Sequence, residues 1–93
     1  MDLSAGQIVY AKNGRDAGKP FIIVAAADGY VWLADGKRRK FARPKRKKSK
    51  HVRLTNRFAD VLREKLENGQ MINDSDIRKA LVPYRGQDGS AFE

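Results

Sequence analysis

The residues with the clearest chemical potential are the cations of positions 37–57, where 12 of 21 residues are Lys or Arg and none is Asp or Glu. Cationic groups at this density repel one another unless an anion neutralises them. Guanidinium groups can hold phosphate oxygens in pairs, and each neutralised phosphate releases counterions. The segment therefore predicts binding to a nucleic-acid backbone, through Lys37, Arg38, Arg39, Lys40, Arg43, Lys45, Arg46, Lys47, Lys48, Lys50 and Arg53.

Three other interpretations of this segment stay open. It could be a disordered loop that only interacts with water, a nuclear-import signal, or a patch for a membrane surface. Phe41, Pro44, Val52 and Leu54 interrupt the charges, as expected of a segment anchored to a fold. No amphipathic helix carries the cations, which disfavours the membrane surface.

A second group of candidate residues lies in an earlier loop. Around Gly18, the side chains of Lys12, Asn13, Arg15 and Lys19 are suited to contact phosphate. Asp16 lies among them, and it could pair locally with Arg15 or Lys19, or accept a hydrogen bond from a base or a 2′-hydroxyl.

Tyr30 and Trp32 share one face of an expected strand. An exposed ring there could stack on a base, whereas a buried ring would only pack in the core, and for Trp32 the two alternatives have even weight.

Catalysis and metal binding find little support in the residue types. The chain has no Cys and a single His, His51. The acidic residues Asp60, Glu64, Glu67, Asp74 and Asp76 have the spacing of helix surfaces and no accompanying nucleophile or phosphate-binding glycine loop. We therefore expect no catalytic residues, no cofactor and no metal.

The size and composition bound the elements that must position these side chains. With 93 residues, a mass of 10.5 kDa and a net charge of +9, one small domain is expected. The absence of Cys favours the reducing cytoplasm. The longest uncharged apolar run, residues 20–27, is too short to cross a membrane, and the first residues lack a basic leader region.

Alternating and β-branched residues predict strands at 7–12, 21–27, 30–34 and 51–54, and a shorter strand at 40–43. The Asp-Gly pairs at 28–29 and 35–36 are typical hairpin turns. Pro44 and residues 45–50 are expected to form an exposed connection, because so many charges cannot enter a core.

The apolar period changes to that of a helix after Asn56. Phe58, Val61, Leu62 and Leu66 share a helical face, which ends at residues 68–69. A second short helix follows the N-cap sequence at 73–76 and ends at Leu81, before Pro83. Either this apolar face packs on its own domain, the favoured interpretation, or it docks another protein.

Together these elements predict an α+β fold, in which a small five-stranded β-barrel at residues 1–55 precedes two short helices at 56–84 and a disordered tail at 85–93. The expected core consists of Ile8, Tyr10, Phe21, Ile23, Val31, Leu33, Val52 and Leu54, or their alternates on the same strands.

Residues 6–24, with Gly18 at the hallmark glycine position, resemble the KOW motif of ribosomal proteins and transcription elongation factors. The similarity covers roughly residues 5–55. It extends through 33–36 and 43–47 toward the KOW-containing large-subunit ribosomal protein fourteen of archaea and eukaryotes and its short bacterial relatives.

The resemblance implies an SH3-like barrel that binds RNA rather than DNA, with residues 13–19 as an RNA-facing loop. It further implies large-subunit ribosomal RNA as the partner, in translation or ribosome assembly. The alternative is an adaptor of the transcription or translation machinery, which uses residues 56–84 to dock a protein.

Overall fold

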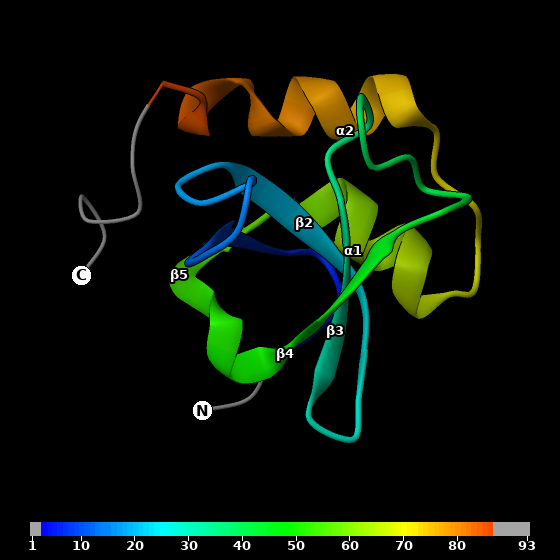
Figure 1. Cartoon of the computed structure of the whole chain (residues 1–93). Helices are drawn as coiled ribbons and strands as arrows, with labels where there is room; N and C mark the ends of the chain where they lie inside the picture. The colour runs from blue at the N-terminus through cyan, green and yellow to red at the C-terminus, as the bar shows by residue number, and fades with distance from the viewer. Residues whose placement is uncertain (1–2, 87–93) are drawn as a thin grey trace.

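The computed structural model describes residues 3–86, and its centre is one five-stranded antiparallel sheet. The strands are β1 (Gln7–Ala11), β2 (Pro20–Ala27), β3 (Tyr30–Ala34), β4 (Lys45–Lys48) and β5 (Val52–Phe58), in the spatial order β4-β3-β2-β1-β5 (Figure 1). The predicted meander of the first three strands is confirmed. At the β2–β3 turn, Asp28 and Gly29 have φ values of 54° and 81°, as a tight hairpin requires.

The prediction for the fourth strand was wrong. Residues 40–43 do not form it; instead Lys45–Lys48, expected to be an exposed connection, pairs with β3 through Val31↔Lys47 and Leu33↔Lys45. The charges did not prevent strand formation because β4 is an edge strand, which joins the ladder through its backbone while its side chains stay at the surface.

The expected hairpin turn at Asp35 and Gly36 is also a different structure. A longer loop, residues 35–44, joins β3 to β4. Asp35 Oδ1 accepts hydrogen bonds from the backbone N–H groups of Lys37, at 2.9 Å, and Arg39, at 2.8 Å. The Asp35 side chain therefore organises this loop, in the manner of an Asx turn.

The boundary between the last strand and the first helix lies further along than predicted. β5 continues past residue 55 to Phe58, and helix α1 (Asp60–Glu67) begins only at Asp60. Phe58 lies opposite Gln7 of β1, and the Gln7 Nε2 donates a hydrogen bond to the Thr55 carbonyl at 2.9 Å. Pairing with β1 thus outweighs the helical spacing of Phe58, and Val61, placed on the buried helical face, is 67% exposed.

The second helix, α2 (Asp74–Leu81), follows the sequence signals closely. Asn73 is its N-cap, and its side chain accepts a hydrogen bond from the Asp76 N–H at 2.8 Å. Pro83 lies in the short 3₁₀ helix η2 (Val82–Tyr84), which follows directly. Of the expected tail, residues 87–93 lie outside the described residues, while Arg85 still donates its N–H to the Val82 carbonyl.

Apolar side chains pack on both faces of the sheet. On one face, α1 and α2 contribute Leu62, Ile77 and Leu81, which pack against Ile8 and Ile22. The other face holds a second cluster, formed by Val9, Ala11, Phe21, Ile23, Val31, Leu33 and Val52. The expected core residues are buried, except for half-buried Leu54. The two helices therefore share a core with the strands.

Burial of β2 is confined to its first half. Phe21, Ile22 and Ile23 are buried, as its apolar run predicts, but Ala25, Ala26 and Ala27 are exposed beyond a bulge between Ile23 and Ala25. The ladder pairings of the described residues leave β4 and β5 as edges of the sheet. Within those residues, neither helix has the length and apolarity needed to cross a bilayer.

Candidate nucleic-acid interface

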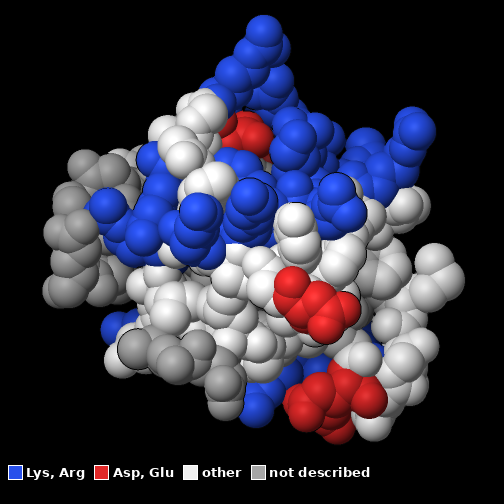
Figure 2. Space-filling model, turned by 60° about the horizontal axis from the view of Figure 1, so that its bottom comes forward, with Lys and Arg blue, Asp and Glu red and all other residues white. Residues whose placement is uncertain are grey.

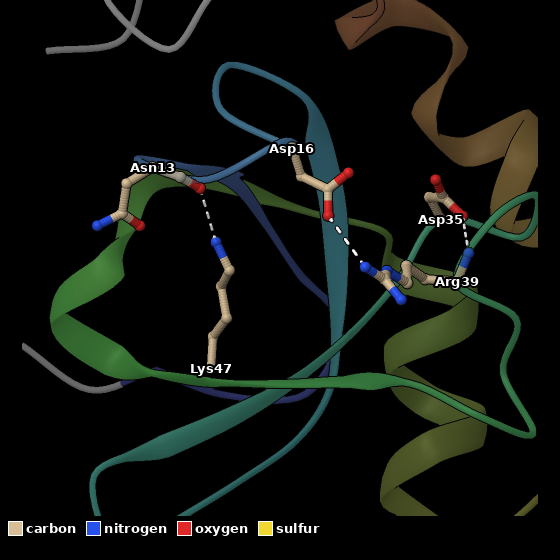
Figure 3. Close-up of polar contacts among 5 residues, drawn as sticks. All are labelled: Asn13, Asp16, Asp35, Arg39 and Lys47. Carbon is tan, nitrogen blue, oxygen red and sulfur yellow. Dashed lines mark hydrogen bonds and ion pairs between the residues drawn. The ribbon is translucent and has the colours of Figure 1, made fainter.

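The two candidate segments, far apart in the sequence, lie side by side in the structure. The β1–β2 loop, residues 12–19, is linked to the β3–β4 loop and to β4 (Figure 3). Lys47 Nζ donates a hydrogen bond to the Asn13 carbonyl at 2.9 Å. Arg39 Nη2 lies 3.5 Å from Asp16 Oδ2. Two cross-links thus hold the glycine-containing loop against the basic segment.

Asp16 is the acidic residue of the β1–β2 loop. It does not pair with Arg15 or Lys19, the two local partners considered from the sequence. Its side chain is only 9% exposed and pairs with Arg39, which is 38% exposed. The Arg39 backbone is in turn held by Asp35. Arg39 and Lys47, both predicted RNA ligands, therefore make contacts within the protein that shape the surface.

Replacing Asp16 by Asn should lower stability and raise RNA affinity. The substitution removes the charged partner of Arg39, and because that side chain is partly solvated we expect a loss of about 1 kcal/mol in the free energy of unfolding. One more unpaired cation should strengthen RNA binding about fivefold at about 0.1 M salt. Chemical denaturation and fluorescence anisotropy with labelled RNA measure the two effects.

Glu64→Gln is the matched control for Asp16→Asn, since it removes one charge from an exposed position of α1. It should leave both the unfolding free energy and the affinity nearly unchanged. Weaker RNA binding by Asp16→Asn would contradict the structural role and would indicate that the Asp16 carboxylate accepts a hydrogen bond from the RNA itself.

Most of the other predicted cations are exposed. Figure 2 shows Lys and Arg side chains gathered in a broad band across one face, with most of the visible Asp and Glu outside it. Exposed members of the predicted set are Lys12, Arg15, Lys19, Lys37, Arg38, Lys40, Arg43, Lys45, Arg46, Lys48 and Lys50, and Arg53 is half-buried. We call these twelve residues, together with Arg39 and Lys47, the basic surface.

A cleft of about 580 Å³ lies where the β1–β2 and β3–β4 loops meet the end of η2. Four cations line it, Lys19, Lys37, Arg38 and Arg85, together with Asp35, whose Oδ1 accepts the two loop N–H groups. Sequence reasoning missed Arg85, which follows Pro83 in the segment expected to be disordered. Apart from its charge, Arg85 carries no signal in the sequence, because only the packing of α2 and η2 brings it here.

Gly18, at the rim of this cleft, has φ of +82° and open space where a side chain would begin. Glycine adopts this left-handed conformation without strain, and a backbone without Cβ can approach a phosphate closely. The conformational and the binding explanations of Gly18 are therefore compatible.

Helix α2 holds the β3–β4 loop in place. Asp74 Oδ1 accepts a hydrogen bond from the Phe41 N–H at 2.7 Å, and the Arg78 guanidinium donates to the Gly36 carbonyl. Gly36 has φ of +77° and packs against the backbone of α2, so that a side chain there would collide with the Asp74 carbonyl. These contacts with α2 fix the loop that carries Lys37 and Arg38.

Tyr30 and Trp32, the candidate stacking residues, are both half-buried, and neither belongs to a core cluster of the described residues. The Arg46 guanidinium carbon lies 4.9 Å from the centre of the Tyr30 ring. His51 is half-buried in the 3₁₀ helix η1 (Ser49–His51). Tyr30 and Trp32 therefore lie next to the basic surface, since they pair with Lys48 and Arg46 of β4.

Two of the acidic residues singled out in the sequence have structural partners. Asp74 binds the Phe41 N–H, and Glu67 lies 3.2 Å from Arg63. Within residues 3–86, no three His, Cys, Asp or Glu side chains are grouped closely enough to hold a metal ion.

The apolar faces of the helices are largely occupied by the sheet. Leu62, Ile77 and Leu81 are buried, and Leu66 packs against their cluster. Val61 and Met71 are exposed instead, Met71 at 79%. The favoured interpretation of the helical pattern, packing on the chain's own sheet, is confirmed for Leu62 and Leu66.

Comparison with known proteins assigns no family to the chain. No protein-family model matches the chain, and a search of curated proteins found no significant match.

Proposed function

We propose that this chain is a non-catalytic RNA-binding protein whose ligand is ribosomal RNA of the large subunit. The observation that supports it best is the junction of the β1–β2 loop with the basic segment, through the Lys47–Asn13 and Arg39–Asp16 contacts. This junction gathers cations from separate parts of the chain on one face, and such surfaces suit a phosphate backbone.

The strand order β4-β3-β2-β1-β5 is compatible with the SH3-like barrel that the KOW resemblance implies. In our proposal the strands curl into such a barrel, with the β1–β2 loop and its Gly18 on the RNA side. RNA is preferred to DNA, and the ribosome to other RNA, on the strength of that resemblance alone.

The proposed mechanism is binding. Phosphate contacts from Lys and Arg set the position of the RNA, since such contacts orient a protein without reading its sequence. The cleft beside Gly18 receives a phosphate between Lys19, Lys37, Arg38 and Arg85. The fixed loops supply shape, because structured RNA is recognised chiefly by its backbone geometry and its unpaired segments.

The adaptor function has less support. An adaptor would need an apolar helical face free for a partner, yet Leu62, Ile77 and Leu81 pack against the sheet. Val61 and Met71 remain exposed, but single exposed apolar side chains are usual on protein surfaces.

Sedimentation of the tagged protein from native lysate tests the proposal. We expect migration with large ribosomal subunits at low salt, release as salt rises, and loss of the large-subunit fraction after ribonuclease treatment. Purified protein should also bind purified large-subunit RNA. Migration at the top of the gradient in every condition, together with no binding to purified RNA, would contradict the proposed function.

A further inference from the structure

One face of β3 carries two aromatic rings that belong to neither core cluster of the described residues. Along β3, Val31 and Leu33 are buried, whereas Tyr30 and Trp32 alternate with them and are half-buried. Successive residues of a strand point to opposite faces, so the two rings lie on the face opposite Val31 and Leu33. This is the face whose other end, at Ala34, packs in the cluster with α1 and α2. Neither is among the residues of the two core clusters of the described chain.

Cations from β4 flank these rings. Trp32 lies opposite Arg46, and Tyr30 lies opposite Lys48, in the antiparallel register of β3 with β4. Opposite residues of such a pair project from the same face. The Arg46 guanidinium carbon is also 4.9 Å from the centre of the Tyr30 ring. A cation–π contact with Tyr30 therefore holds the Arg46 guanidinium on the face of the sheet that Trp32 shares.

On the other side of β3, the neighbours are small. Ala25 lies opposite Trp32 and Ala27 opposite Tyr30, and both alanines are exposed. A methyl group covers little of an indole ring. Figure 1 shows the turn of this hairpin at the far end of the sheet from α2. The strands β2, β3 and β4 contain no Asp or Glu that would repel a phosphate.

We infer that Trp32 is a stacking platform for an unpaired RNA base, with Arg46 and Lys48 contacting the flanking phosphates. An indole beside a guanidinium offers a flat surface to any base and charge to its backbone, as proteins that hold single strands do. Tyr30 is a positioning residue, which acts by holding Arg46. The inference rests on the proposed function and narrows its ligand to RNA with an unpaired segment, because paired bases are already stacked on one another.

The experiment uses three RNA ligands: a short single strand, an abasic strand with the same number of phosphates, and a duplex of equal length. Labelled-RNA anisotropy gives the affinities of the parent protein, Trp32→Ala and Trp32→Phe. We expect Trp32→Ala to bind the base-containing single strand about tenfold more weakly. It should bind the abasic strand and the duplex as the parent does, and Trp32→Phe should retain most of the affinity.

Trp32 is also the only tryptophan of the chain, so its fluorescence reports on this site alone. We expect quenching of the parent protein by the base-containing strand and not by the abasic strand at equal saturation. The slope of log affinity against log salt should be the same for Trp32→Ala and the parent, because no phosphate contact is lost.

Failure of the platform and failure of the proposed function give different results. RNA binding by the parent without tryptophan quenching, or equal losses on all three ligands in Trp32→Ala, would overturn the platform and leave RNA binding in place. No binding of any RNA by the parent would overturn the proposed function and the platform with it.

Discussion

Replacing Lys37, Arg38 and Arg85 together by Gln should weaken RNA binding on the order of 100-fold at about 0.1 M salt. All three side chains are exposed and line the cleft beside Gly18. Each lost phosphate contact lowers the slope of log affinity against log salt by about 0.7 to 0.9. At about 0.1 M salt this corresponds to a loss of about fivefold or more in affinity for each contact. Anisotropy titrations with large-subunit RNA over a range of salt concentrations measure both quantities.

The matched control replaces Arg57, Lys65 and Lys79 by Gln, which removes the same net charge from residues outside the basic surface. The control should lose little affinity, because only long-range attraction is reduced and salt screens it. Equal losses in the two variants would mean that the protein attracts RNA by net charge alone. Unchanged affinity and slope in the first variant would remove the cleft from the interface.

Arg85 on its own gives the sharpest test of the cleft. It comes from the segment that the sequence predicts to be a disordered tail, and the packing of η2 places it with Lys19, Lys37 and Arg38. A single Arg85→Gln substitution, contained in the triple variant, should account for about a third of its change in salt slope.

Ile77→Ala should lower the free energy of unfolding by about 2–5 kcal/mol, as large-to-small substitutions in cores do. Ile77 is 0% exposed on α2 and belongs to the cluster of Ile8, Ile22, Leu62 and Leu81, which joins the helices to the sheet. A domain of this size is stable by only about 5–15 kcal/mol, so the loss is a large share of the total. Chemical denaturation measures it, and the melting temperature should fall by about 4–8 °C per kcal/mol.

Val61→Ala is the control for Ile77→Ala. Val61 is also a β-branched residue of a helix, but it is 67% exposed. Its effect should stay within about 0.5 kcal/mol. A small effect of Ile77→Ala on the free energy of unfolding would contradict a core shared by the helices and the sheet. It would indicate that the helices and the sheet unfold separately.

Parts of the candidate interface could be predicted from residue types, and others could not. The cations of positions 37–53 and the loop around Gly18 stand out by charge and turn chemistry, and most are exposed as expected. That Asp16 pairs with Arg39, and Lys47 with the Asn13 carbonyl, depends on contacts across more than twenty residues of chain. Spacing along a sequence carries no information about such contacts.

What the sequence determined by itself is local. The Asp28-Gly29 turn, the three-strand meander and the Asn73 cap of α2 depend on neighbouring residues, and all three are present. Only the tertiary structure decided that Lys45–Lys48 is a strand and that Phe58 ends β5 rather than starting a helix. In both places backbone pairing with a distant strand, to β3 and to β1, outweighs the local pattern of charge or apolar spacing. The physical reason is that a ladder satisfies backbone hydrogen bonds whatever the side chains are. At β4 the edge position also leaves most of the charged side chains at the surface.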